Sequence, residues 1–162
     1  MSRLDSFIAR MQAQRDCLNH VAEAVRAEPG PILELGLGNG RTYDHLRTLF
    51  RRRDIYVFER KVAAHPDCVP PPNRLFLGKA ESTLPRATKQ LGATAALIHT
   101  DLGTGDHEAN MAMAEWLGPA IDSLVAQGGY ILSNQALTVK RWRALRLPAS
   151  VKKGRYFLYR AG

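Results

Sequence analysis

The chain of 162 residues has two cysteines and no apolar run that approaches the ~18 residues needed to span a bilayer. Cys17 and Cys68 have no metal-ligand spacing and form no disulfide framework, so we expect two reduced thiols and no metal site. The N-terminal segment Met1–Arg10 lacks the apolar core of a signal peptide, and its acidic residue argues against a transit peptide. These absences predict a cytoplasmic protein with no membrane partner.

Acidic residues are scarce relative to basic ones, with 15 Asp and Glu against 23 Lys and Arg and a net charge of +8. A basic surface attracts phosphate without sequence preference, so a nucleic-acid-binding or RNA-modifying module is one hypothesis. The basic clusters are Arg51–Arg53, Lys140–Arg143, and Lys152 and Lys153 with Arg155. The first cluster closes a predicted helix, where cations favourably meet the helix dipole, and Trp142 in the second is more often a packing residue than a base-stacking one. We therefore favour a small-molecule partner over nucleic acid.

Glycine is concentrated after the first predicted strand, where Ile32–Gly40 reads Ile-Leu-Glu-Leu-Gly-Leu-Gly-Asn-Gly. Gly36, Gly38 and Gly40 can adopt positive φ and have no Cβ, so a ligand can lie directly against the backbone. The following segment, Arg41–Phe50, has the apolar spacing of a helix. A glycine loop between a strand and a helix N-terminus favours a nucleotide-like ligand.

The glycine spacing distinguishes between two kinds of nucleotide. The dinucleotide fingerprint G-x-G-x-x-G needs a third glycine where this chain has Arg41, so an NAD-dependent oxidoreductase is a less favoured alternative. The pattern acid-x-G-x-G-x-G is satisfied throughout, starting from Glu34. Glu59 follows a second apolar strand, nineteen positions after Gly40, where a carboxylate can accept hydrogen bonds from both hydroxyls of an unphosphorylated ribose.

Apolar periodicity predicts alternating strands and helices in one domain of residues 1–162, with an N-terminal helical part at 1–28 and a core at 32–162. Helices are expected at 4–27, 41–50, 84–91, 107–126 (with Pro119 as a kink and Gly128-Gly129 as its stop) and 138–145. Strands are expected at 32–35, 55–58, 75–77, 95–99 and 130–133, followed by a terminal hairpin of 146–151 and 155–160. This alternation predicts a parallel sheet with helices on both faces.

Polar or glycine-rich residues follow four of the predicted strands. They are Glu34–Gly40, Glu59, Gly78–Glu81 and Thr100–Asp101. Because ligands of such sheets bind beyond the carboxyl ends of the strands, we expect these residues to converge on one site.

The acid-x-G-x-G-x-G loop resembles the first motif of class I S-adenosylmethionine-dependent methyltransferases, and the organisation from Ile32 onward resembles the same class. The segment His99–Asp106, together with the leading helix, is similar to a small bacterial methyltransferase family of unassigned substrate. The resemblance implies a Rossmann-like three-layer sandwich. Its sheet would be mostly parallel and seven-stranded, with a C-terminal antiparallel hairpin and an N-terminal helix. S-adenosyl-L-methionine would be the cofactor.

The resemblance also implies site roles. Asp101 would lie near the methionine amino group and the reacting methyl group. The cofactor-binding residues would be Glu34, Gly36, Leu37, Gly38, Asn39, Gly40 and Thr42 around the methionine and adenosine, Glu59 and Arg60 at the ribose, and Ala80 and Glu81 beside adenine. Many relatives have Asp where this chain has Lys79, and a cation cannot accept a hydrogen bond from the adenine amine.

Methyl transfer mainly requires alignment of the nucleophile, and a base only if that nucleophile arrives protonated. Asp101 is the first candidate for a catalytic residue, whereas His99 is expected in the core and Asp106 as a helix N-cap. The Asn/Asp-Pro-Pro-aromatic motif of amino-methylating nucleic-acid enzymes is replaced by Thr100–Gly103, and Cys68 is remote from the site.

We therefore expect a methyltransferase acting on a small, anionic acceptor, with a homo-oligomer as a further expectation. The alternatives are the nucleic-acid module described above and a protein that binds the cofactor without turnover. The N-terminal helix is expected to pack on the core, to cover the ligand or to form an oligomer surface.

Overall fold

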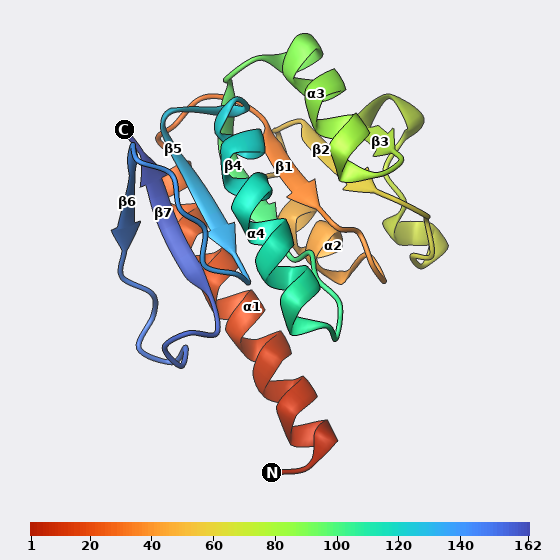
Figure 1. The fold of residues 1–162 in the computed structure, drawn as a ribbon. Helices are drawn as coiled ribbons and strands as arrows, with labels where there is room; N and C mark the ends of the chain where they lie inside the picture. Colours follow the sequence, from red (N-terminus) through yellow and green to blue (C-terminus); the bar gives the residue numbers. More distant parts are fainter.

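A computed structural model describes residues 1–162, and its centre is a seven-stranded sheet of order β3-β2-β1-β4-β5-β7-β6 (Figure 1). The strands are β1 (Ile32–Leu35), β2 (Ile55–Glu59), β3 (Leu75–Leu77), β4 (Ala95–Thr100), β5 (Val125–Ser133), β6 (Trp142–Leu145) and β7 (Phe157–Ala161). The helices are α1 (Arg3–Val25), α2 (Arg41–Leu49), α3 (Ala80–Leu91) and α4 (His107–Asp122).

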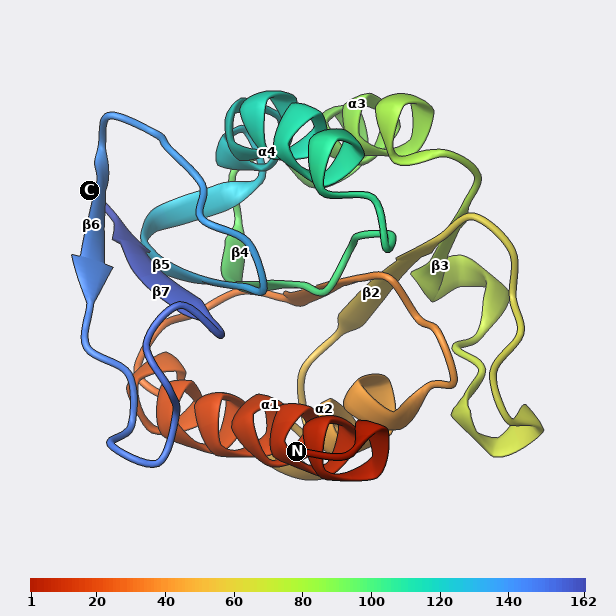
Figure 2. The same cartoon turned by 60° about the horizontal axis from the view of Figure 1, so that its bottom comes forward.

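Helices cover the sheet on both faces and give three layers, as Figure 2 shows. Helices α1 and α2 pack on one face, and α3 and α4 on the other. Successive strand residues serve opposite faces, so Ile32 packs beneath α1 and α2 while Leu33 packs beneath α3 and α4. Strands buried on both faces explain why these segments are almost continuously apolar.

The first five strands run parallel, and β7 is antiparallel to both of its neighbours, β5 and β6. The predicted fold class is therefore confirmed: a mostly parallel sheet with an antiparallel C-terminal hairpin and an N-terminal helix. The carboxyl ends of the parallel strands meet along one edge (Figure 1), which brings the polar strand ends of the sequence together.

The predicted boundary between α4 and β5 was wrong. The helix ends at Asp122 and β5 already begins at Val125, whereas the apolar spacing had predicted helix to residue 126. Gly128 and Gly129 lie within the strand, where the register against β4 shifts. A Cβ on Gly129 would lie 2.6 Å from the carbonyl oxygen of Ala95, so this glycine permits a close approach of strands and does not stop a helix. Pro119 lies within the helix.

The C-terminal hairpin was also placed wrongly. Its first strand is β6, in the segment predicted as a short helix at 138–145, and the predicted strand at 146–151 is a loop. Pairing with β7 decides this outcome, because Trp142 stands opposite Ala161 and packs against the ring of Tyr159. Pro148 lies in the loop, where its missing N–H costs no ladder hydrogen bond.

Helix α1 begins with a capping box in which Ser2 and Asp5 bond reciprocally. Its C-terminal half is buried on the sheet through residues such as Leu18 and Val21. Its N-terminal half extends past the carboxyl edge of the sheet (Figure 1) and leaves Leu4 and Phe7 exposed. None of the helices combines the length and the apolar character that a membrane crossing requires.

Candidate active site

The glycine loop after β1 presents bare backbone at one position and packs tightly at another. Gly36, Gly38 and Gly40 have φ values of +92°, +51° and +84°. A Cβ on Gly38 would meet no atom within 4 Å, whereas one on Gly40 would lie 2.4 Å from the Cβ of Cys68. Gly38 therefore faces open space that a ligand can enter, and Gly40 is required by packing.

Glu59, at the carboxyl end of β2, holds this loop in place. Its Oε2 accepts the N–H groups of Leu37 and Gly38 at 2.8 and 3.1 Å. Its Oε1 accepts those of Arg60 and Lys61 at 2.7 and 3.2 Å. The carboxylate joins the first two strand ends, and its contact with a ribose stays a prediction.

Glu34 supports the loop from behind. It is fully buried, and its oxygens lie 2.6 Å from Thr42 Oγ1 and 2.7 Å from His99 Nδ1. This arrangement fixes the start of α2 against β1 and β4. The structure therefore gives the Glu34 carboxylate a positioning role. Its direct contact with a cofactor stays a prediction.

His99 is a core residue, as expected from its position in an apolar strand, and its pKa is raised. Burial opposes the charged ring, but the adjacent Glu34 carboxylate outweighs burial and raises the pKa of His99, with Asp101 adding to the effect. Nε2 of this ring has no hydrogen-bond partner. The imidazole stacks beside Tyr156, with ring centroids 6.5 Å apart.

Two adjoining pockets lie along the carboxyl edge. The loop pocket has a volume of about 350 Å³ and is lined by Gly36–Asn39, Thr42, Glu59 and Asp101 together with Arg10, Met11 and Gln14 of α1. The α4 pocket, of about 280 Å³, is lined by Arg60, Ala80 and Glu81 together with Met113 and Trp116 of α4. Both pockets include Glu59 and Leu102, so they form one continuous groove.

Asp101, at the end of β4, marks the boundary of a third cavity. Its Oδ2 accepts a hydrogen bond from Nε2 of Gln14. Gln14 belongs to α1, and its side chain is almost completely buried. Asp101 and Arg10 line both the loop pocket and this third cavity. The Asp101 carboxylate therefore lies between the loop pocket and this third cavity.

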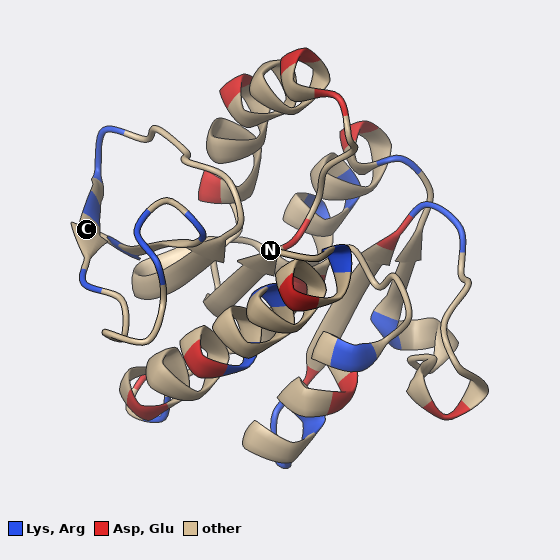
Figure 3. Ribbon diagram, turned by 90° about the horizontal axis from the view of Figure 1, so that it is seen from below, with Lys and Arg blue, Asp and Glu red and all other residues tan.

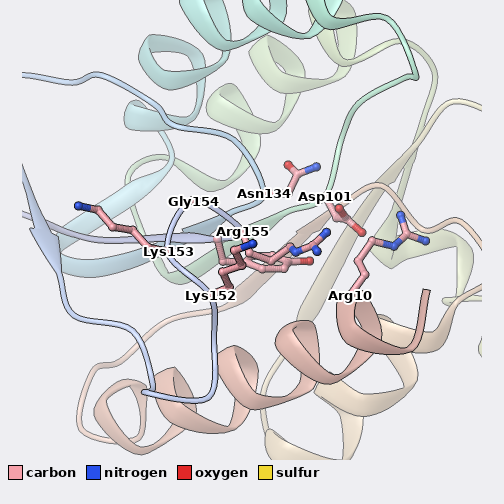
Figure 4. A pocket seen from close by; sticks show the side chains of 8 residues that line it. Arg10, Asp101, Asn134, Lys152, Lys153, Gly154 and Arg155 are labelled. Carbon is pink, nitrogen blue, oxygen red and sulfur yellow. The ribbon is translucent and has the colours of Figure 1, made fainter. Parts of the chain in front are cut away.

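The third cavity, the cationic pocket, has a volume of about 420 Å³. Its charged residues are Arg10, Lys152, Lys153 and Arg155 around the single acid Asp101. In Figure 4, Arg10 and Arg155 extend toward Asp101 from two different elements, and Lys153 points away from it. Seen from this edge, α1 and α2 carry residues of both signs, the C-terminal loop carries basic residues, and α4 carries several acids (Figure 3).

The family of the chain follows from comparison with known proteins. The family model of S-adenosyl-L-methionine methyltransferases matches residues 1–161. The chain belongs to this family. A methyltransferase of the same description from Silicibacter pomeroyi DSS-3, known from its crystal structure, is 47% identical with a TM-score of 0.94, and the match covers 100% of this chain and 99% of that one.

More distant methyltransferases share the fold alone. Human methyltransferase-like protein 13, solved in complex with SAH, is 14% identical with a TM-score of 0.58, over 97% of this chain and 80% of that one. A comparison with curated proteins found no match. The enzyme is thus a methyltransferase, and its cofactor is S-adenosyl-L-methionine.

The groove of this methyltransferase fits that cofactor. Bare backbone at Gly38 leaves room for the methionine and ribose portions, and Glu59 stands between the two pockets. Trp116 and Met113 offer apolar surface to a purine ring, and Ala80 and Glu81 begin a helix without a side-chain cap. The backbone N–H groups at this uncapped helix start can donate hydrogen bonds to the adenine ring. Many relatives have an aspartate at the position of Lys79.

Most of the predicted site residues of the methyltransferase meet in this groove. Gly36, Leu37, Gly38, Asn39, Thr42, Glu59, Arg60, Ala80, Glu81 and Asp101 all line it, whereas Glu34 and Gly40 do not. Two secondary expectations are confirmed: Asp106 caps α4 through the N–H groups of Glu108 and Ala109, and Trp142 is a packing residue bonded to Asp122.

The sequence reasoning missed the residues that α1, α4 and the C-terminal loop bring to the site. Covering the ligand was one expectation for the N-terminal helix, but Arg10, Met11 and Gln14 were not named as site residues, and Trp116 was assigned to an apolar helix face. One signal was available for Gln14. It occupies a buried position of the apolar face of α1, between Ala13 and Cys17, where a polar side chain needs a partner.

Proposed function

We propose that this methyltransferase transfers the methyl group to a small anionic acceptor bound in the cationic pocket. The observation that carries the proposal is the position of this pocket, which shares Asp101 and Arg10 with the loop pocket. The pocket is lined by four cationic residues and a single acid, and this excess of positive charge favours the entry of an anion. The pocket volume of about 420 Å³ lies within the range of small-molecule sites.

The bound cofactor supplies an electrophilic methyl group on a sulfonium centre. Arg10 and Arg155 would orient the acceptor, since a guanidinium offers two parallel donors to a carboxylate or phosphate. Asp101 would take the proton of an acceptor that arrives protonated. The Tyr156 phenol lines the same cavity, and burial together with the nearby Asp101 raises its pKa, so that it stays a neutral hydrogen-bond donor.

Formation of S-adenosylhomocysteine, measured with matched pairs of acceptors, tests this function. Carboxylates, phosphate monoesters and phenolates should support turnover where their neutral amides and ethers do not. Replacing two cations, Lys152→Met with Arg155→Met, should raise KM by at least about tenfold, because a hydrogen bond to a charged group contributes about 1.5 kcal/mol or more. Arg51→Gln is the matched control, since Arg51 is exposed in the turn that follows α2 and lines none of the site pockets.

Two results would contradict the proposal. Turnover that requires RNA and is indifferent to every small acid would favour the nucleic-acid alternative. Unchanged KM in the double variant would remove the cationic pocket from acceptor binding. For an acceptor whose nucleophile arrives protonated, Asp101→Asn should lower kcat by about 10²-fold or more, whereas turnover of an acceptor that is already ionised should change much less.

A further inference from the structure

A fourth cavity lies next to the cationic pocket, beside the loop that connects β6 and β7. This hairpin pocket has a volume of about 510 Å³ and is lined mainly by apolar residues, among them Leu145, Leu147, Pro148, Val151, Phe157 and Leu158. Leu145, Leu147, Pro148 and Phe157 are half-buried, so part of their apolar surface is open to a ligand, and covering it would be favourable.

The hairpin pocket and the cationic pocket have a common wall. Lys153, Gly154 and Tyr156 line both cavities. A Cβ on Gly154 would meet no atom within 4 Å, so the wall is bare backbone at this point, with open space beside it. Lys153 points away from Asp101 in Figure 4, so its ammonium group lies apart from the reacting end of the cationic pocket.

Tyr156 is the buried residue of this wall. Its side chain is 2% exposed, and its hydroxyl has no hydrogen-bond partner. A buried, unpartnered hydroxyl is costly unless a bound molecule or water satisfies it. The ring of Tyr156 is part of the wall between the two cavities, and its hydroxyl is enclosed on the side of Asp101 and Gln14.

From this juxtaposition we infer that the acceptor is an amphipathic acid, with its anionic group among the cations and an aliphatic or aromatic body in the hairpin pocket. The inference rests on the proposed function, because it assigns a substrate class to the same site. A compact polar anion would leave the hairpin pocket unused, whereas an apolar body would complete the burial of its half-buried side chains Leu145, Leu147 and Phe157.

Calorimetric titration of the S-adenosylhomocysteine-loaded enzyme with linear carboxylates from butanoate to decanoate tests the inference. Burial of each added CH₂ should tighten binding by about threefold to fourfold until the pocket is filled. Ala144→Trp and Ala149→Trp add bulk at exposed positions that line the hairpin pocket, so the chain should still fold. Each variant should abolish the dependence on chain length and leave butanoate binding unchanged. Ala27→Trp, at an exposed position after α1, is the matched control.

The inference and the proposed function fail in different ways. Equal affinity along the whole carboxylate series, or a chain-length dependence that persists in both tryptophan variants, would overturn the inference and leave the anionic acceptor standing. The proposed function itself would be overturned if the loaded enzyme bound no carboxylate and if the KM for the acceptor were unchanged in the double variant Lys152→Met with Arg155→Met.

Discussion

Gln14 of helix α1 donates a hydrogen bond to Asp101 across 87 positions of the sequence. The donor is 4% exposed, and the acceptor stands between the loop pocket and the cationic pocket. A helix that precedes the whole sheet in the chain thus fixes the carboxylate proposed to act in catalysis. Gln14 is therefore a positioning residue.

Gln14→Leu should lower the free energy of unfolding by about 2 kcal/mol and weaken binding of S-adenosylhomocysteine, because it removes a hydrogen bond to a charged group. Gln14→Glu should be more harmful at pH 8 than at pH 5, since two adjacent carboxylates repel when both are ionised. Thermal unfolding and calorimetry at the two pH values measure both effects. Gln12→Leu, at an exposed position two residues earlier on the helix, is the control. Equal behaviour of Gln12→Leu and Gln14→Leu would show that the hydrogen bond has no role.

The glycine loop should separate ligand binding from stability. Gly38→Ala adds a methyl group in open space at positive φ, so it should cost only about 1–2 kcal/mol of stability while it blocks the cofactor. Gly40→Ala should destabilise the enzyme more, because its methyl group would collide with Cys68. Unfolding in urea and the melting-temperature shift caused by S-adenosylhomocysteine report the two effects. A full shift in Gly38→Ala would exclude the bare backbone from the cofactor site.

The buried pair of His99 and Glu34 predicts a specific pH dependence of stability. Because the folded-state pKa of His99 is raised, its contribution is complete below about pH 6.5, the ordinary value in an unfolded chain. The contribution is lost as the pH rises through the folded-state pKa. Urea unfolding between pH 6 and pH 10 should show this decline in the native enzyme. The decline should be absent in His99→Gln and retained in His20→Gln, where an exposed histidine is replaced.

The two cysteines should differ in reactivity. Burial, with a smaller effect of Asp16, raises the pKa of the Cys17 thiol to about 12, so almost no thiolate exists at neutral pH. Cys68 is partly exposed. Iodoacetamide at pH 8 should add one alkyl group to the native protein, at Cys68, and two in urea. Peptide mass mapping identifies the position, and modification of Cys17 in the native protein would contradict its burial.

The part of the site on the parallel strands could be predicted from the sequence. Gly38, Glu59 and Asp101 each follow a strand at a recognisable distance, and parallel topology alone brings such strand ends to one edge. The spacing of glycines and of the acid after β2 therefore carried spatial information. No such rule connects a helix at the start of the chain with the end of β4.

The rest of the site depends on long-range packing that local patterns do not encode. Arg10 and Gln14 reach the groove only because α1 packs along the sheet past its edge. Trp116 fits an apolar helix face equally well whether it contacts the core or a ligand. Arg155 was predicted to begin the second strand of a tight hairpin but lies in the loop before β7, and the cationic pocket arises because that loop is long.

Secondary structure was mispredicted where pairing overrides local preference. The segment from Thr138 to Leu145 contains polar and basic residues at helical spacing, but pairing with β7 makes Trp142–Leu145 an edge strand. Gly128 and Gly129 had indicated a helix stop, although the structure uses them for a register shift inside β5. Both errors concern the C-terminal third, where strand partners lie far apart in sequence.

The hydrogen bonds of Glu59 have a consequence for its predicted contact with the ribose of the cofactor. A carboxylate has about four lone-pair sites, and four backbone amides already occupy them. A ribose that binds there must displace amides of the loop, so binding is an exchange of partners with little net gain in hydrogen bonds. The amides of Leu37 and Gly38 would then exchange their hydrogens faster in the loaded enzyme, while the surrounding backbone is protected.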